Sequence, residues 1–253
     1  MAASITYVNH ATLLIQLNGV TVLTDPIYSR TITFFIPRRQ KPGIPFAQLP
    51  SIDYIVVSHS DYDHLNLKTL RMLRRRGATT IVVPHGLSRY CRKAGFEDII
   101  ELRSWESAER PNARITCTPA KHQSKRTAWD RTGSSCCGFV IEAHGQTVFF
   151  AGDTGYDLFF SELGGRFSID AALLPIGAYK PEKWFKNLHL HPTTALRAFQ
   201  DLRAKHLVPY HWGTFWISDE PMAEPPQLLL AEAERQNIRE RVHVLNNGES
   251  LHL

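Results

Sequence analysis

Cysteine is scarce in this chain and forms no recognisable pattern. The 253 residues contain four cysteines, and none of them stands in a CxxC pair. The adjacent Cys136 and Cys137 cannot easily bridge each other, and Cys91 and Cys117 follow no framework spacing. The sequence therefore argues against a disulfide scaffold and against a zinc site made of thiolates. It predicts reduced thiols in a cytoplasmic protein.

Long apolar runs, export signals and domain linkers are also lacking. No run approaches the length that spans a bilayer, and the first residues lead into a strand pattern without the features of a signal peptide. No segment rich in Pro, Gly or Ser divides the chain. Its 43% hydrophobic and 21% charged residues are typical of a globular protein. We expect a cytoplasmic protein in which residues 1–253 form a single domain.

Acidic residues are fewer than basic ones. The 24 Asp and Glu residues stand against 29 Lys and Arg residues, which gives a net charge of +5 at pH 7. Cations cluster at residues 38–41 and at residues 74–76. Such clusters can meet phosphate, nucleic acid or anionic lipid, but the second one ends a predicted helix, where cations suit the helix dipole. The charge indicates an anionic partner without identifying it.

The apolar pattern predicts two strand-rich halves of similar order, each with helices after its first strands. Asn18-Gly19 and His144-Gly145 predict tight hairpin turns. The predicted strands are 5–8, 12–17, 20–24, 54–57, 80–83, 98–102, 114–118, 137–143, 147–151, 171–175, 206–209 and one near 242–245. The predicted helices are 67–76, 87–94, a short one that starts at 152–155, 193–202 and about 226–236. Two sheets between helical layers would accommodate this order.

The segment His59-Ser60-Asp61-Tyr62-Asp63-His64 places four potential metal ligands directly after the apolar run 54–57. Carboxylates so close together repel each other, and a bound cation is the simplest way to stabilise them. The alternative is a solvated loop with two incidental histidines. Three other predicted strands lead to His122, Asp153 and His211. Because functional groups collect where strands give way to loops, we expect these side chains to converge on one pocket.

With these segments the sequence resembles the metallo-β-lactamase superfamily, whose signature is HxHxDH followed by a His, an Asp and a final His. Within it, the chain is similar to the N-acyl-phosphatidylethanolamine-hydrolysing phospholipase D family and its bacterial relatives. The resemblance extends from about residue 5 to residue 250. The segments that carry it are Asn9–Thr12, Leu23–Pro26, Ser58–His64, Ala120–Gln123, Ala151–Tyr156, Pro175–Tyr179 and His211–Phe215. It implies an α/β fold, a four-layer αββα sandwich of metallo-β-lactamase type.

The resemblance also implies two divalent metal ions, with zinc the first choice. The ligands it assigns are His59, Asp61 and His122 for one ion, Asp63, His64 and His211 for the other, and Asp153 as a bridge. Position 61 departs from the family, which has His there. A carboxylate can still bind zinc, but it also suits iron or manganese. The departure could instead weaken the first site and leave one tightly held ion.

Two metal ions about 3.5–4 Å apart can hold a hydroxide between them and neutralise charge in the transition state. The resemblance thus implies a metal-dependent hydrolase, foremost a phospholipase D-like phosphodiesterase acting on a small-molecule or lipid phosphodiester. The chain contains no GxSxG nucleophile motif, which agrees. A lactonase or other ester hydrolase fits the same metals, and so does a non-catalytic sensor with a weakened first site. No specific nucleic-acid binding is expected, and the oligomeric state is left open.

Four residues are candidates for roles other than metal binding, and one of them, Asp63, is also an assigned ligand. Asp63 could supply a proton to the leaving group. His189 matches a family histidine near the substrate pocket, which suggests contact with the substrate phosphate or proton transfer. His10 and Asp25 match positions close to the site, where they would orient ligands, with structural packing as the alternative.

Aromatic residues lie near the same segments. Tyr179 and Trp212 could line a slot for acyl chains or belong to the core. Residues 33–36 form an apolar loop beside Arg38, Arg39 and Lys41. Apolar groups next to cations suit peripheral contact with an anionic membrane surface.

Overall fold

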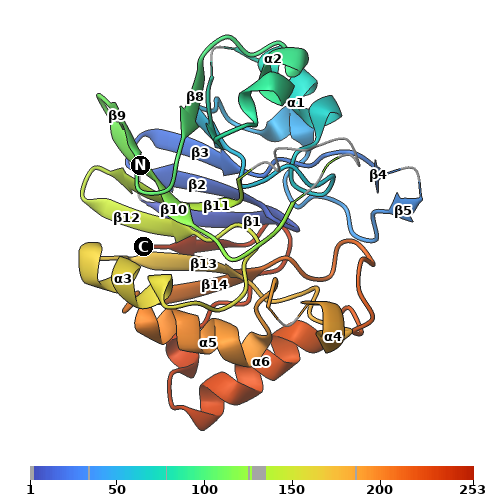
Figure 1. Ribbon diagram of the computed structural model, residues 1–253, viewed down its shortest axis with the longest axis vertical. Coiled ribbons are helices and arrows are strands. Elements are labelled where there is room, and N and C mark those ends of the chain that lie inside the picture. The colour runs from blue at the N-terminus through green and yellow to red at the C-terminus, as the bar shows by residue number, and fades with distance from the viewer. Residues whose placement is uncertain (1–2, 34, 78, 125, 127–134, 186) are drawn as a thin grey trace.

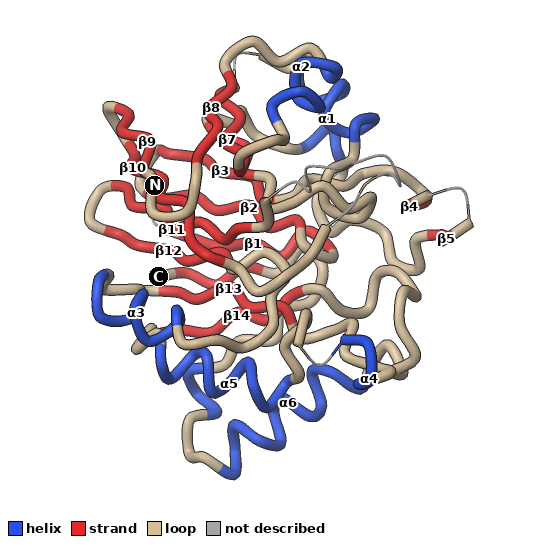
Figure 2. The backbone as a smooth tube through the Cα atoms, in the orientation of Figure 1, coloured by secondary structure: helices blue, strands red, loops and turns tan. Residues whose placement is uncertain are grey.

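The computed structural model describes residues 3–33, 35–77, 79–124, 126, 135–185 and 187–253. In these residues two mixed sheets lie face to face, and helices cover the outer face of each sheet (Figure 1). The tube in Figure 2 shows the same order of layers, with the strands in the middle and the helices at both ends. The predicted αββα sandwich is confirmed.

The first sheet begins with antiparallel strands and continues with parallel ones. Its pairs from β15 through β1 and β2 to β3 are antiparallel, and its pairs from β3 through β6 and β7 to β8 are parallel. The predicted hairpin turn is present, with positive φ at Asn18 and Gly19. In spatial order the strands are β15 (Ser250–His252), β1 (Ser4–Asn9), β2 (Thr12–Leu17), β3 (Val20–Thr24), β6 (Tyr54–Val56), β7 (Thr80–Pro84) and β8 (Ile99–Leu102).

The second sheet follows the same plan. Antiparallel pairs join β9 to β12, and parallel pairs join β12, β13 and β14. In spatial order the strands are β14 (His206–Tyr210), β13 (Ala171–Pro175), β12 (Gln146–Phe150), β11 (Cys137–Ala143), β10 (Ala113–Pro119) and β9 (Ser107–Arg110). A small separate hairpin contains β4 (Thr31–Ile32) and β5 (Ile36–Pro37).

Alternation along the strands explains the layers. In β6, Val56 belongs to the core between the two sheets, whereas its neighbour Ile55 belongs to the core beneath the helices. In β13, Leu173 faces the central core and Leu174 faces the helices on the other side. Because successive side chains of a strand point to opposite faces, a strand that is apolar at every position is buried on both faces.

The helices bury one face each against the sheets. Helices α1 (Leu67–Arg74) and α2 (Ser88–Ala94) cover the first sheet. Helices α3 (Phe159–Arg166), α5 (Pro192–Asp201) and α6 (Glu224–Arg235) cover the second sheet. A short helix α4 (Glu182–Phe185) and two 3-10 turns, η1 (Phe46–Gln48) and η2 (Arg239–Arg241), lie in the connections. Gly95 ends α2 with φ of 96°, as the sequence predicts.

Two predicted elements are wrong. The segment Gly152–Gly155 does not start a helix, because the Thr154 hydroxyl accepts the Lys121 amide and the Gly155 amide donates to the Lys121 carbonyl. These bonds tie the segment to the loop that carries His122, and α3 begins only at Phe159. Residues 242–245 form no strand and make a single bridge from Val242 to Leu207, and the last strand is β15.

Other sequence predictions have different outcomes. No helix in the described ranges is long and apolar enough to span a bilayer. The four cysteines are free thiols, three of them buried. Phe34, part of the predicted apolar loop, lies outside the described residues. The single domain over residues 1–253 stays a prediction.

Candidate metal centre

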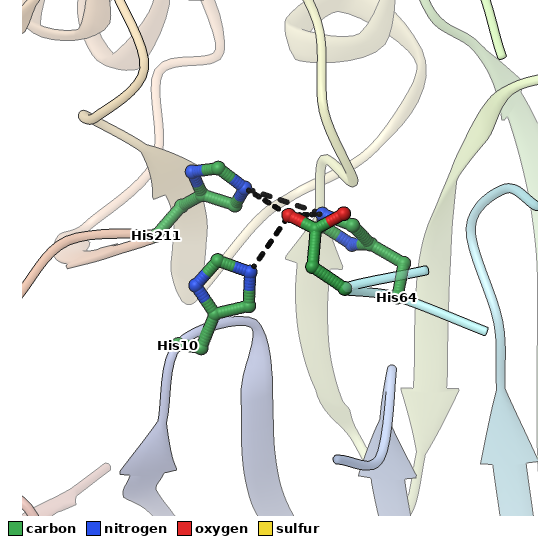
Figure 3. Close-up of side chains that lie close together, drawn as sticks. His10, His64 and His211 are labelled. Carbon is green, nitrogen blue, oxygen red and sulfur yellow. Dashed lines mark hydrogen bonds and ion pairs between the residues drawn. The ribbon is translucent and has the colours of Figure 1, made fainter. Parts of the chain in front are cut away.

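Five segments bring His and Asp side chains to the same edge of the two sheets. The loop after β6 carries His59 to His64, and His122, Asp153 and His211 follow β10, β12 and β14. His10 lies in the turn between β1 and β2. Figure 3 shows the imidazoles of His10, His64 and His211 turned towards one another around a carboxylate. The predicted convergence of strand ends is therefore present in the structure.

One group of these side chains consists of His59, Asp61 and His122. The Asp61 Oδ2 atom lies 3.4 Å from His59 Nε2 and 3.5 Å from His122 Nε2. Ligand atoms bound about 2.0–2.1 Å from a tetrahedral zinc ion lie about 3.3 Å from one another. The three atoms are thus spaced as the ligands of one ion would be.

A second group consists of Asp63, His64, Asp153 and His211. The Nε2 atoms of His64 and His211 lie 3.2 Å apart, and they lie 3.2 and 3.1 Å from Asp153 Oδ2. Asp63 Oδ2 lies 3.6 Å from each of the same two nitrogens. These separations again match the edges of a small coordination shell. Asp153 therefore lies against the second group, and its Oδ2 is 3.8 Å from His189 Nδ1 on another side.

Hydrogen bonds at Nδ1 determine how three of the histidines face the cluster. His64 Nδ1 donates to Asp25 Oδ2 at 2.7 Å, and His122 Nδ1 donates to the Leu188 carbonyl at 3.0 Å. The Ser58 hydroxyl gives its one proton to Asp25 Oδ2, so it accepts from His59 Nδ1 at 2.8 Å. In the neutral form each ring then has its Nε2 lone pair directed into the cluster, which is the arrangement that metal ligation needs.

Charge in the cluster is balanced between carboxylates and imidazoles. Burial alone would raise the pKa of Asp153, but His211 and His64 outweigh it and hold that pKa well below its ordinary value. Burial likewise opposes a charge on His211, yet Asp153 raises its pKa to about 9. Protons on imidazoles thus stabilise the carboxylates in the metal-free protein. A metal ion that takes their place would release protons.

Several buried polar atoms of the cluster have no hydrogen-bond partner among the described residues. They are His59 Nε2, His122 Nε2, Asp153 Oδ1, His189 Nδ1 and His211 Nδ1. Buried polar atoms in proteins are nearly always paired, because leaving one unpaired costs about 1–3 kcal/mol. Two of the orphaned atoms, on His59 and His122, belong to the first group. The residues present therefore fit divalent ions bound among these atoms.

His10 and Asp25 contact the candidate ligands. Asp25 is fully buried and accepts hydrogen bonds from the Ser58 amide, the Ser58 hydroxyl and His64. Burial, with help from His211, lowers the pKa of His10 to about 4, so the ring is neutral and its Nε2 donates to Asp63 Oδ2 at 3.1 Å. The His10 carbonyl also accepts the His211 amide. Both residues therefore lie beside the candidate ligands, and their role in orienting them stays a prediction.

His189 closes the cluster on the side of α4. Its ring lies 4.9 Å from that of His122, and burial lowers its pKa to about 3. His191 instead caps α5, where its Nδ1 accepts the Thr193 amide. The structure therefore separates the two histidines that the sequence puts two residues apart.

The two predicted aromatic residues lie in different surroundings. The Trp212 ring stacks on Tyr7 and, with His10 and His211, borders a small cavity. The Tyr179 side chain is buried next to His191 and is not among the residues that border this cavity.

Gly152 allows the Asp153 segment to approach the metal loop. Its φ is +63°, and a Cβ atom there would lie 2.6 Å from the Cys137 carbonyl oxygen and 2.7 Å from Ser58 Cβ. Only glycine tolerates both the left-handed backbone and this contact. The sequence motif identified the segment without giving this reason.

Sequence reasoning missed three residues that hold the metal loop: Ser58, Ser124 and Arg126. Ser58 and Ser124 bond directly to candidate site residues, and Arg126 donates to the carbonyls of Ser60 and Leu65. The available signals were weak, since Ser58 only precedes the first His and Ser124 lies two residues after His122.

Comparison with known proteins agrees with this centre. The family model described as "Beta-lactamase superfamily domain" matches residues 20–212. The chain belongs to this superfamily, within the metal-dependent hydrolases of the metallo-β-lactamase fold.

Two curated relatives and one solved structure illustrate the relationship. A metal-dependent hydrolase of Exiguobacterium sp. is 32% identical and covers 93% of this chain and 95% of its own length. The mitochondrial N-acyl-phosphatidylethanolamine-hydrolyzing phospholipase D of Saccharomyces cerevisiae is 35% identical over 92% of this chain and 52% of its own length. A metallo hydrolase of the archaeon Ignicoccus hospitalis superposes with a TM-score of 0.78 at 23% identity, over 100% of this chain and 99% of its own. The chain spans about half to two thirds of the length of the first curated relatives that it matches.

Proposed function

We propose that this protein is a metal-dependent phosphodiesterase of the phospholipase D kind with two ions in its centre. The observation that carries the proposal is the pair of ligand groups with metal-ligand spacing and unpaired buried atoms. In this assignment His59, Asp61 and His122 would hold one ion. Asp63, His64 and His211 would hold the other, and Asp153 would contribute to both. Zinc fits all of these ligands, and iron or manganese fits the group with Asp61.

When bound, the ions would activate water for attack and neutralise negative charge on the substrate. The residues around them hold the ligands in place. His10 orients Asp63 by donating from Nε2, and Asp25 orients His64 through Nδ1. His189 has an unpaired Nδ1 directed towards Asp153, and we assign it to the substrate phosphate or to proton transfer near it. Asp63 is the candidate proton donor to the leaving group.

A phosphodiester substrate is supported by the relatives and by the exposed cations. The yeast relative is named for hydrolysis of a phospholipid. Arg39 and Lys41 are exposed near the predicted apolar loop, and Arg39 lies over the Trp216 ring at 5.9 Å. These cations would favour an anionic substrate or an anionic surface that presents it.

The test is elemental analysis of the purified chain together with Asp153→Ala. We expect about two divalent ions per wild-type chain and hydrolysis of bis(p-nitrophenyl) phosphate. The Asp153→Ala variant should keep its fold but lose bound metal, and hydrolysis should fall on the order of 10³-fold.

Asp170→Asn is the matched control. Asp170 is a buried carboxylate directly before β13 that accepts the Thr147 amide and the Lys205 ammonium, and it lies outside the two candidate ligand groups. This variant should keep the wild-type metal content. Full activity of Asp153→Ala, or a metal-loaded wild-type chain that cleaves lactones but no phosphodiester, would contradict the proposal.

A further inference from the structure

The two oxygens of the Asp61 carboxylate have different surroundings. Oδ2 faces the Nε2 atoms of His59 and His122 at 3.4 and 3.5 Å. Oδ1 points away from them and accepts a hydrogen bond from the Ser124 hydroxyl at 2.6 Å. One oxygen is therefore available to an ion and the other is already occupied. This matters because position 61 is where the chain departs from its superfamily's HxHxDH signature.

The hydroxyl proton of Ser124 is donated to Asp61. The Ser124 oxygen also lies 3.2 Å from the Ser60 amide and 2.5 Å from the Ser60 hydroxyl. Since Ser124 donates its single proton to Asp61, it must accept both bonds from Ser60. The result is a directed chain from Ser60 to Ser124 to Asp61, in which each hydroxyl aligns the next. Ser124 is 4% exposed, so water does not compete for these bonds.

Arg126, two residues after Ser124, also holds the loop that carries Asp61. Its Nη1 donates to the carbonyl of Ser60 at 2.7 Å and to that of Leu65 at 2.8 Å, and its guanidinium lies 4.3 Å from the centre of the Tyr62 ring. Ser60 and Leu65 bracket the segment that carries Asp61 and Asp63. The loop is thus held at both ends, and Ser124 then sets the rotation of one carboxylate within it.

We propose that Ser124 is a positioning residue that makes Asp61 a one-oxygen ligand of the first metal ion, and so replaces what a histidine would supply at this position. An imidazole presents one lone pair in one direction. A carboxylate can instead bind with either oxygen or with both, and the Ser124 bond removes that freedom. The inference rests on the proposed metal centre and adds to it a dependence between positions 61 and 124.

The dependence can be measured as a double-mutant cycle of metal binding. The four chains are the wild type, Ser124→Ala, Asp61→His and the double variant, each freed of metal and titrated with Zn²⁺ and with Mn²⁺ against a chromophoric chelator. The binding step that Asp61→Ala removes identifies the first site. Loss of a residue that orients a ligand lowers metal affinity by about 10–100-fold.

We expect Ser124→Ala to weaken the first binding step by about 10–100-fold and to leave the second step unchanged. In the Asp61→His background the same substitution should change affinity by less than about 2-fold, because an imidazole at 61 does not need the hydroxyl. Ser124→Thr keeps a hydroxyl and should restore wild-type binding. Thr80→Val is the control. It removes another hydroxyl that donates to a carboxylate, that of Asp98, at the far end of β7.

Three results would overturn the inference. Wild-type binding by Ser124→Ala would show that Asp61 needs no alignment. An equal loss in both backgrounds would show that Ser124 only supports the fold, as would failure of Ser124→Thr to restore binding. A wild-type chain that binds no divalent ion at all would overturn the proposed metal centre itself. This outcome is distinguishable from the other three, because the wild type and all variants would then behave alike.

Discussion

At the scale of single residues, the backbone at Gly152 lies so close to Cys137 and Ser58 that a larger side chain there should destabilise the protein. We expect Gly152→Ala to lower the free energy of unfolding by about 2–4 kcal/mol, because the new Cβ would contact the Cys137 carbonyl and Ser58 and because φ is +63°. Gly145→Ala separates the two causes. Gly145 also has positive φ, of +80°, but apart from its two neighbours in sequence no described residue has an atom within 4 Å of its Cβ position. Its cost should be about 1–2 kcal/mol.

Urea unfolding of both variants measures the difference. Equal losses would mean that backbone strain alone determines the cost and that the strand ends tolerate a wider separation. A loss in Gly152→Ala accompanied by reduced metal content would link the close approach to the metal centre, because Ser58 bonds to both Asp25 and His59.

The sequence could predict which side chains gather, but not what holds them. The candidate ligands stand out in the sequence because His and Asp residues directly follow apolar runs there. They are residues His59 to His64, His122, Asp153 and His211. The hydroxyls of Ser58 and Ser124 carry no such signal, since serine is common in loops and its partner is decided only by folding. The use of one Asp61 oxygen and not the other was also beyond the sequence.

At the scale of elements, strands that are buried along nearly their whole length were predicted almost to the residue, as for β2, β3, β11 and β13. The short edge strands β9 and β15 were not predicted. β9 and β15 are partly exposed and have few apolar positions, so nothing in them distinguishes a strand from a loop. Residues 242–245 gave the opposite error. Their apolar residues pack along β14, but only one bridge forms.

That segment contains a contact between two histidines. His243 Nε2 lies 3.0 Å from His206 Nδ1 at the start of β14, and the His243 amide donates to the Leu207 carbonyl. Burial, followed by His206 and Arg239, lowers the pKa of His243. Below the ordinary histidine pKa the unfolded chain then binds more protons than the folded chain. The stability contributed here is therefore present at neutral pH and is lost as pH falls towards the folded-state pKa.

We expect His243→Gln to flatten this part of the pH profile. Between pH 7.5 and pH 5 the wild type should lose more unfolding free energy than the variant, since every other group titrates in both chains. Urea unfolding at the two pH values, with both proteins freed of metal, measures the difference. Parallel profiles would show that the His206–His243 contact does not respond to protonation.

At the scale of the whole molecule, three large aromatic side chains are exposed to solvent. Phe35, Trp184 and Trp216 are 88%, 65% and 62% exposed. They lie on the β4–β5 hairpin, on α4 and on the loop after β14, and the hairpin and α4 lie on the same side of the molecule (Figure 1). Lys183 and Arg39 lie near the rings of Trp184 and Trp216. This combination is the basis for proposing peripheral contact with an anionic membrane.

The prediction is that the protein sediments with vesicles that contain anionic phospholipid and much less with vesicles of phosphatidylcholine alone. Trp184→Ala and Trp216→Ala should each weaken binding by about 10-fold, because each removes an aromatic ring that the interface would bury. Leu158→Ala is the matched control. Leu158 is 73% exposed, but it directly precedes α3, which lies on the opposite side of the molecule from α4 (Figure 1).

The Leu158→Ala control distinguishes a specific membrane-binding surface from nonspecific adsorption to vesicles. If Leu158→Ala weakens vesicle binding as much as the tryptophan variants do, the contact is nonspecific. If none of the three variants matters, the aromatic residues face a small-molecule substrate or solvent. Hydrolysis of bis(p-nitrophenyl) phosphate should stay at the wild-type rate in Trp184→Ala and Leu158→Ala, because neither residue borders the cavity next to His10 and His211, whereas Trp216 does. A fall confined to a vesicle-embedded phospholipid substrate would tie membrane contact to the delivery of substrate.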